Sequence, residues 1–384
     1  MARQLRYIPE GGALVHVTTR TIQGRYLLRP SPALNEILVG VLARAQRLYP
    51  VGVCAAVAAS NHYHLILRVE SSKRLADFMA YFNGNAAREI SRLTGWNARV
   101  WSRRFHAIVI SNEEAAQVEV LRYVLSHGAK EGLVQFLRQW PGLHCVRVLL
   151  DGEPLVGYWF DRTKEYAARL RREDFDRLKY ATREELLLEP LACWEHLSPE
   201  TRRKRIADLV QGIEEEAAAE REKTGVSPPG PAAVCAKHPH DRPNKLKKSP
   251  APLFHAATRR VRNELYQMYA AFVAAFRDAA EKLRAGDLTA AFPPGASHPL
   301  CRGWVDNSRL SRPSPALTSV LPPSSRAREI GRGVPSRRLA ADPSSFEEAC
   351  SRPKCPLAPP SPSQSQAGVA IRGTTAVLVH APLQ

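Results

Sequence analysis

The sequence predicts an α+β domain in which an antiparallel sheet of ferredoxin-like (split βαβ) type is covered by helices. Between residues 13 and 134, short apolar and β-branched runs alternate with longer segments whose apolar residues repeat with helical period. The segments follow the order strand, helix, strand, strand, helix, strand, helix. That order suits a sheet of this type with helices packed against it.

The first four elements are expected before residue 70. Residues 13–20 alternate apolar and polar side chains, as a half-buried strand does. Ser31, followed directly by a proline, predicts a helix start, because serine caps a helix N-terminus and proline fits its first position. Residues 53–59 and 64–69 are apolar runs separated by a few polar residues, which predicts a hairpin of central strands.

Three further elements complete the expected domain. Residues 75–93 place their large apolar side chains on one helical face, and Gly95 marks the end of that helix. Residues 105–111 form a fourth strand in this interpretation. Asn112, followed by two glutamates, predicts the N-terminus of a last helix, whose apolar face continues to Gly128.

Composition divides the chain into five expected regions. Residues 1–141 are the domain itself, and residues 142–223 are a helical, basic extension that includes a solvated, charge-laced helix. Residues 224–257 are rich in proline, glycine and lysine, which predicts a linker. Residues 258–288 return to helical period as one amphipathic helix. Residues 289–384 are rich in proline, serine and arginine, and we expect them to form a largely disordered tail.

The charge balance favours a polyanionic partner. Lysine and arginine exceed the acidic residues by 18, and the sequence pI is about 9.9. A basic surface or tail with no partner would give the same numbers. The seven cysteines form no C-x-x-C pair, which argues against a disulfide framework and a cysteine zinc site. With no signal peptide or long apolar run, we expect a soluble cytoplasmic protein of bacterial type, associated with the nucleoid when bound to DNA.

The sharpest chemical signal is a pair of histidines that straddle one bulky residue. His62 and His64 stand at the start of an apolar strand, where residues two apart point to the same face. Two imidazoles can then reach one metal ion. Two ordinary half-buried histidines would give the same pattern. A second pair, His238 and His240, has the same spacing in a proline-rich stretch without a strand to support it, and we assign it no role.

The pair His62 and His64 belongs to one of four sequence blocks that occur together in this chain. They are GALVHVTTR (12–20), ASNHYHLIL (59–67), VWSRRF (100–105) and RYVLSHGAKEGLV (122–134). In this order and spacing they resemble the HUH endonucleases, and more closely the single-tyrosine transposases of REP-associated and insertion-sequence type. The resemblance spans about residues 7–134.

The resemblance implies an enzyme that cuts and rejoins single-stranded or hairpin-bearing DNA. The tyrosine that matches the family's nucleophile is Tyr123, which would attack a DNA phosphate and leave a 5′-phosphotyrosine and a free 3′-hydroxyl. His62 and His64 would hold a divalent metal, Mg²⁺ or Mn²⁺, that acts as a Lewis acid. Because family members often exchange the tyrosine helix between subunits, a homodimer is also implied.

The sequence departs from the family one turn after the tyrosine. Where relatives commonly carry asparagine, this chain has His127, which lies four residues after Tyr123 and so on the same helix face. His127 is therefore our candidate third ligand. A histidine stabilised by the dipole of a helix C-terminus explains it equally well. Three histidines would favour Mn²⁺ or Zn²⁺ over Mg²⁺. His16, on the polar face of the first strand, is given at most a supporting role.

A set of basic and aromatic residues suits contacts to phosphates and unstacked bases. Its members are Arg20, Arg68, Trp101, Arg103, Arg104 and Arg122. An arginine-rich surface over a tryptophan-containing core would also account for them. Two other functions stay open: a nucleic-acid-binding module that has lost nicking, suggested by the altered segment after Tyr123, and a rolling-circle-type replication nickase. The nickase is less favoured because the chain has no helicase P-loop.

Overall fold

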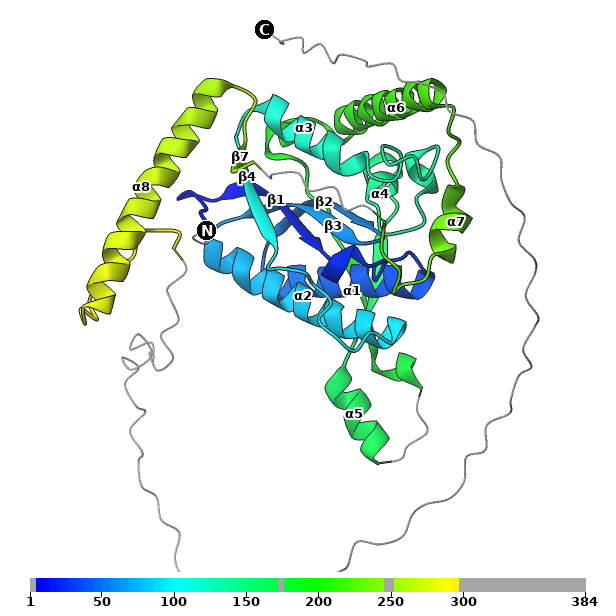
Figure 1. Ribbon diagram of the computed structural model, residues 1–384, viewed down its shortest axis with the longest axis horizontal. Helices are drawn as coiled ribbons and strands as arrows, with labels where there is room; N and C mark the ends of the chain where they lie inside the picture. Colours follow the sequence, from blue (N-terminus) through cyan, green and yellow to red (C-terminus); the bar gives the residue numbers. More distant parts are fainter. Residues whose placement is uncertain (1–4, 172–175, 245–251, 297–384) are drawn as a thin grey trace, which may run out of the picture. The chain divides into compact units, whose positions relative to one another are not determined.

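A five-stranded sheet lies at the centre of the computed structural model (Figure 1), which describes residues 5–171, 176–244 and 252–296. Its strands stand in the order β2-β3-β1-β4-β7. All neighbours are antiparallel except β4 and β7, which run parallel. The strands are β1 (Ala13–Arg20), β2 (Gly52–Ala59), β3 (His62–Val69), β4 (His106–Ile110) and β7 (Phe254–His255). The predicted α+β class and the order of the first seven elements are confirmed.

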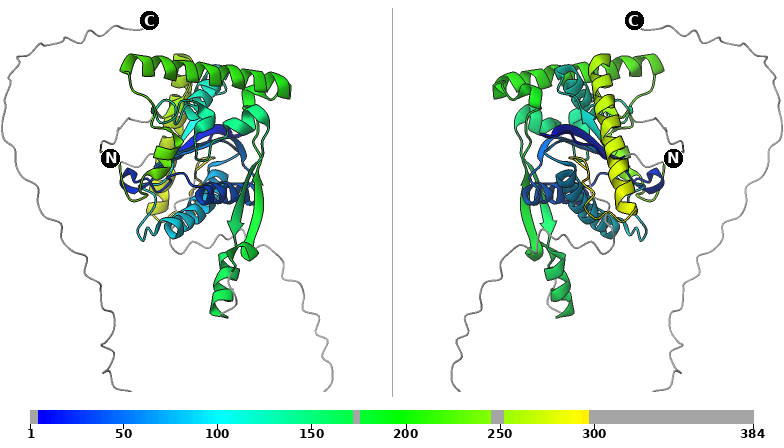
Figure 2. Two further views of the ribbon diagram at one scale, coloured as in Figure 1. Left: turned by 90° about the vertical axis from the view of Figure 1, so that its right-hand side faces the viewer. Right: turned by 90° about the vertical axis from the view of Figure 1, so that its left-hand side faces the viewer.

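Two helices cover one face of the sheet, and three pack on the other (Figures 1 and 2). The first face carries α1 (Pro32–Leu48) and α2 (Ser72–Thr94). The second carries α3 (Glu114–Leu125), α4 (Val146–Asp151) and α6 (Pro199–Thr224). As predicted, the hydroxyl of Ser31 caps α1 by accepting from the Leu34 amide, and Gly95 ends α2 in the left-handed conformation.

The start of α3 differs from the prediction. Glu113, not Asn112, is the N-cap residue, and its side chain does not bond the helix. Its carboxylate instead accepts from the amides of Ala257 and Thr258, 2.8 and 3.1 Å away, and so ties α3 to the chain that follows β7. The helix also ends before the predicted boundary at Gly128.

Residues 142–223 hold structure that periodicity did not reveal. The strands β5 (Leu155–Phe160) and β6 (Ala181–Leu186) form an antiparallel pair that packs on α1. The helix α5 (Arg162–Leu170) belongs to the segment that connects the two strands. The packing is so close that a Cβ at Gly157 would lie 2.0 Å from the Glu36 carbonyl oxygen. The helix α6 is the predicted charge-laced helix, but it is not simply solvated, because it buries Ile206, Val210 and Ile213 in the cluster that contains α3.

Short elements also occur within the predicted linker, residues 224–257. These are α7 (Gly230–Ala236), which buries Val234 beside Trp140, and the strand β7. The predicted amphipathic helix is present as α8 (Arg259–Arg284), whose Phe272 is buried. Four short 3₁₀ segments complete the described elements: Ile22–Gly24, Leu137–Gln139, Arg177–Tyr180 and Ala192–Trp194.

The predicted disordered tail, residues 289–384, lies outside the described residues from 297 onward. Among the helices of the described ranges, none is long and apolar enough to cross a membrane.

Candidate active site

The site lies on the sheet face that α3 covers, beyond the C-terminal end of that helix. Leu14 of β1 and Ile66 of β3 are buried with α3. Because alternate residues of a strand share a face, His16, His62 and His64 point to the same side of the sheet. Past the end of α3, the loop that follows the helix lies against His62 and His64.

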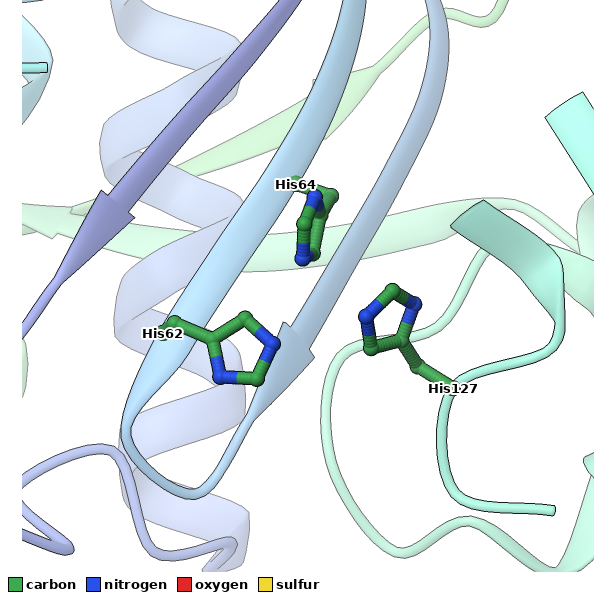
Figure 3. Close-up of side chains that lie close together, drawn as sticks. All are labelled: His62, His64 and His127. Atoms are coloured by element: carbon green, nitrogen blue, oxygen red, sulfur yellow. The ribbon is translucent and has the colours of Figure 1, made fainter. Parts of the chain in front are cut away.

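His127, in that loop, completes a cluster of three histidines (Figure 3). His62, His64 and His127 each offer one ring nitrogen, and these nitrogens all lie within 4.8 Å of one another. The rings come from the start of β3 and from the segment after α3, and they converge on one small space. The cluster is compact enough to hold one cation after small side-chain rotations.

Hydrogen bonds orient two of these rings. The side-chain amide of Asn61 donates to the Gly24 carbonyl at 3.1 Å, which turns its oxygen toward His62 Nδ1, 2.7 Å away. His62 therefore donates from Nδ1. His127 Nδ1 donates to the Val124 carbonyl at 3.0 Å. In both neutral rings the other nitrogen, Nε2, then carries a lone pair that can bind a metal.

His64 gives the clearest indication that the site fits a metal. Its Nδ1 lies 2.8 Å from His16 Nε2. Its Nε2 is buried and has no hydrogen-bond partner among the described residues. A buried polar atom without a partner is costly, and a cation bound to this nitrogen would remove that cost. The three histidines therefore fit a divalent metal ion.

Burial also sets the protonation of the cluster. It lowers the pKa of His62 to about 4 and that of His127 to about 2, and it lowers the pKa of His64 well below its usual value. Nearby positive charge from Arg20 and Lys130 acts in the same direction on His62. All three rings are neutral at neutral pH, which is the form that binds metals.

Tyr123 projects from the last turn of α3 toward the cluster. Its ring centroid lies 5.2 Å from that of His127 and 5.6 Å from that of His64, and its side chain is 46% exposed. Burial, and then the charge of Glu131, raise the pKa of the phenol. The Lys130 ammonium lies 3.6 Å from the ring centroid. The phenol of Tyr123 and the histidine cluster therefore lie side by side at the end of α3.

Comparison with known proteins agrees with this geometry. Residues 13–127 match the family model described as "Transposase IS200 like". The domain belongs to the IS200-like transposase family. This segment contains the three histidines and Tyr123, so the whole candidate site lies inside the transposase domain.

Two solved structures are similar to parts of the chain. One is a REP-associated tyrosine transposase bound to a REP hairpin, with 21% identity over 37% of this chain and 81% of that one, and a TM-score of 0.30. The other comes from Deinococcus radiodurans R1 and was solved as a candidate transposase, with 16% identity over 32% of this chain and 95% of that one, and a TM-score of 0.20. No curated protein matches the chain.

Three of the predicted DNA contacts lie on the exposed surface of the transposase domain. Arg20 ends β1 directly opposite His62. Arg103 and Arg104 precede β4 and line a cavity of about 340 Å³ together with Arg6 and His106. Their role in binding DNA stays a prediction.

The other three predicted contacts are engaged within the protein. Arg68 forms ion pairs with Glu195 and, at 3.9 Å, with Glu189. Arg122 pairs with Glu216 of α6. The Trp101 indole donates to the Asn83 carbonyl at 3.0 Å and packs edge-on against Tyr63. These contacts hold the scaffold together.

Sequence reasoning passed over two residues near the site, Lys130 and His255. Lys130 stands inside the block 122–134 but carries no distinctive pattern. His255 lies near the end of the predicted linker, and only the pairing of β7 with β4 brings it near His16. The second pair, His238 and His240, is not part of the cluster, and His240 Nε2 donates to the Thr94 carbonyl at 2.8 Å.

Proposed function

We propose that this protein is a DNA transposase that cuts and rejoins single-stranded, hairpin-bearing DNA through a covalent bond to Tyr123. The observation that carries the proposal is the approach of the Tyr123 ring to within 5.2 and 5.6 Å, centroid to centroid, of two members of the histidine cluster. Residues 1–141 would carry the chemistry in this proposal. The regions that follow would support that domain.

A divalent cation held by His62, His64 and His127 would supply positive charge to the oxygens of the scissile phosphate. Because all three donors are imidazole nitrogens, the set suits Mn²⁺ better than Mg²⁺, which prefers oxygen. Both ions belong in the assay. The histidines themselves need no proton removed before binding, since burial keeps them neutral.

Tyr123 is the group that would form the new bond. Its phenolic oxygen attacks phosphorus, the bond between phosphorus and the 3′ oxygen breaks, and DNA stays attached through a 5′-phosphotyrosine. The half-exposed phenol releases its proton to solvent, and the leaving 3′ oxygen takes one up from solvent. Because the phosphodiester character is retained, attack by a 3′-hydroxyl reverses the step without a nucleotide cofactor.

The half-buried side chains beside the cluster on this sheet face mark a path for the DNA strand. Thr18 lies opposite His64 on one side and His106 on the other, so one row of side chains leads from the cluster to β4. Arg103 and Arg104 stand at the end of that row. We propose that they contact phosphates next to the scissile one, with Arg20 beside His62.

A labelled single-stranded hairpin oligonucleotide, incubated with the full-length chain and Mn²⁺ or Mg²⁺, tests this function. We expect a covalent adduct that survives denaturing electrophoresis and is absent with Tyr123→Phe or EDTA. Tyr166→Phe is the matched control, because Tyr166 is an exposed tyrosine on α5. A wild-type protein that binds the hairpin with either metal but forms no adduct would refute cleavage and favour the binding module.

One finding favours an active enzyme over an inactive binding module. The altered segment after Tyr123 is what motivated the inactive alternative. In the structure that segment supplies His127, which joins His62 and His64. All four side chains come from one chain, so a homodimer, which stays a prediction, is not needed to supply any of them.

A further inference from the structure

His255 lies well outside the segment that matches the transposase family, yet its ring reaches the cluster through one intermediary. Its Nε2 lies 3.2 Å from His16 Nδ1, and His16 Nε2 lies 2.8 Å from His64 Nδ1. We call His64, His16 and His255 the histidine chain. It runs from a proposed metal ligand on β3, through His16 of β1, to the edge strand β7, which lies beyond β4 in the sheet.

The two contacts in the histidine chain restrict where its protons stand. A neutral imidazole carries one N–H and one lone pair, so both contacts are hydrogen bonds only when all three rings donate in the same direction. In one arrangement His64 donates to His16, which donates to His255, and Nε2 of His64 is bare. In the other, His255 donates to His16, which donates to His64, and Nε2 of His64 is protonated.

The surroundings of His64 distinguish these arrangements. Its Nε2 is buried and has no acceptor among the described residues, so an N–H at this atom would be left unsatisfied. It also faces the space shared with His62 and His127, where a proton would exclude a cation. The arrangement that leaves Nε2 bare has neither problem.

We propose that His255 is a positioning residue of the metal site: it accepts from His16, which makes His16 accept from His64, and so keeps Nε2 of His64 free for the metal. This deepens the proposed function and rests on it for the metal site. Partners of this kind commonly fix the tautomer and ring orientation of a ligating histidine.

The strand β7 is held firmly enough to serve this purpose. Phe254 is buried and packs edge-on against Tyr266 and Tyr269 of α8. The carbonyl of His255 accepts from the Ser111 amide at 2.8 Å. The amide of Ala257, two residues after His255, donates to the carboxylate of Glu113. The end of the predicted linker thus becomes part of the support for the transposase domain.

Mn²⁺ affinity of the full-length chain, measured without DNA by electron paramagnetic resonance at pH 8, tests the proposal. His255→Phe fills similar space but cannot accept a hydrogen bond, and we expect about tenfold weaker binding. His255→Gln, which offers an amide oxygen, should restore most of the affinity. His238→Phe is the matched control, because His238 is outside the cluster. Equal affinity of wild type and His255→Phe would overturn the proposal.

A second measurement does not depend on how the variants fold. Nitrogen-15 NMR of the imidazoles in the metal-free wild type should show His64 protonated at Nδ1 and bare at Nε2. The reverse pattern would overturn the proposal even if His255→Phe failed to fold. Neither measurement involves DNA cleavage, so failure of Tyr123 to form an adduct would leave both results standing and would count only against the proposed function.

Discussion

The Lys130 ammonium lies over the ring of Tyr123, 3.6 Å from its centroid, and 3.4 Å from His127 Nδ1. Burial lowers the pKa of Lys130 to about 8, so the side chain is still mostly charged at pH 7. A cation in this position steadies the aromatic ring and stands close to where a phosphate would be attacked.

Replacing Lys130 with methionine should therefore slow cleavage. Methionine keeps much of the length but removes the charge that favours the phenolate and the attacked phosphate. We expect the rate of adduct formation under single-turnover conditions to fall by about tenfold or more, equivalent to about 1.4 kcal/mol in the barrier. Lys130→Arg should retain most of the rate. A Lys130→Met protein as fast as wild type would mean that the charge has no part in the reaction.

Removal of any one histidine of the cluster should weaken metal binding. For His62→Ala, His64→Ala and His127→Ala we expect at least about a hundredfold loss of Mn²⁺ affinity by calorimetry, because a ligand is lost outright. His238→Ala should change nothing, although His238 belongs to a pair with the same sequence spacing. If His127→Ala bound Mn²⁺ as tightly as wild type, His127 would be only a helix-terminal histidine.

That comparison shows what sequence could and could not predict about the site. The alternation of β3 predicted that His62 and His64 share a face, and the resemblance supplied Tyr123. For His127, helical spacing left two interpretations open, and only the fold shows that the loop after α3 turns its ring toward β3. His255 depends on a two-residue parallel strand, which has too few residues to produce a period.

In the fold too, features set by neighbouring residues in the sequence were predicted, and features set by distant residues were not. Caps such as Ser31 and Gly95 are local signals, and they predicted the helix boundaries correctly. The sequence does not predict the pair β5 and β6, because both strands are short and β5 contains Gly157. Glycine weakens the strand signal, and here it allows close packing on α1. Asn112 was assigned the cap of α3, but Glu113 is held in that place by its bonds to the chain after β7.

Stability of the metal-free protein should fall in mild acid. Burial holds the folded pKa of His16 at about 3, and of His62 and His255 at about 4, below the ordinary value of 6.5. The unfolded chain therefore takes up protons that the folded chain excludes as the pH falls through 6.5. Stability is complete above about pH 7 and is lost progressively toward pH 4, by up to about 1.4 kcal/mol per pH unit for each histidine.

Urea unfolding in EDTA at pH 5, 6, 7 and 8 measures this dependence. The double variant His16→Gln, His62→Gln should show a shallower dependence between pH 5 and 7, because two of the titrating groups are gone. An unfolding free energy in the wild type that stays level from pH 8 to pH 5 would show that these rings are protonated in the folded protein.

The exposed arginines should contribute to DNA affinity through phosphates, and not through bases. Removing one side chain that contacts a phosphate reduces the magnitude of the slope of log affinity against log salt by about one. The double variant Arg103→Ala, Arg104→Ala should therefore lower the slope for a single-stranded hairpin by about two, with a similar loss of affinity for unrelated sequences. Arg122→Ala is the comparison, because Arg122 is already paired with Glu216 and should alter the slope little. Equal slopes for the double variant and wild type would place the DNA path elsewhere on the domain.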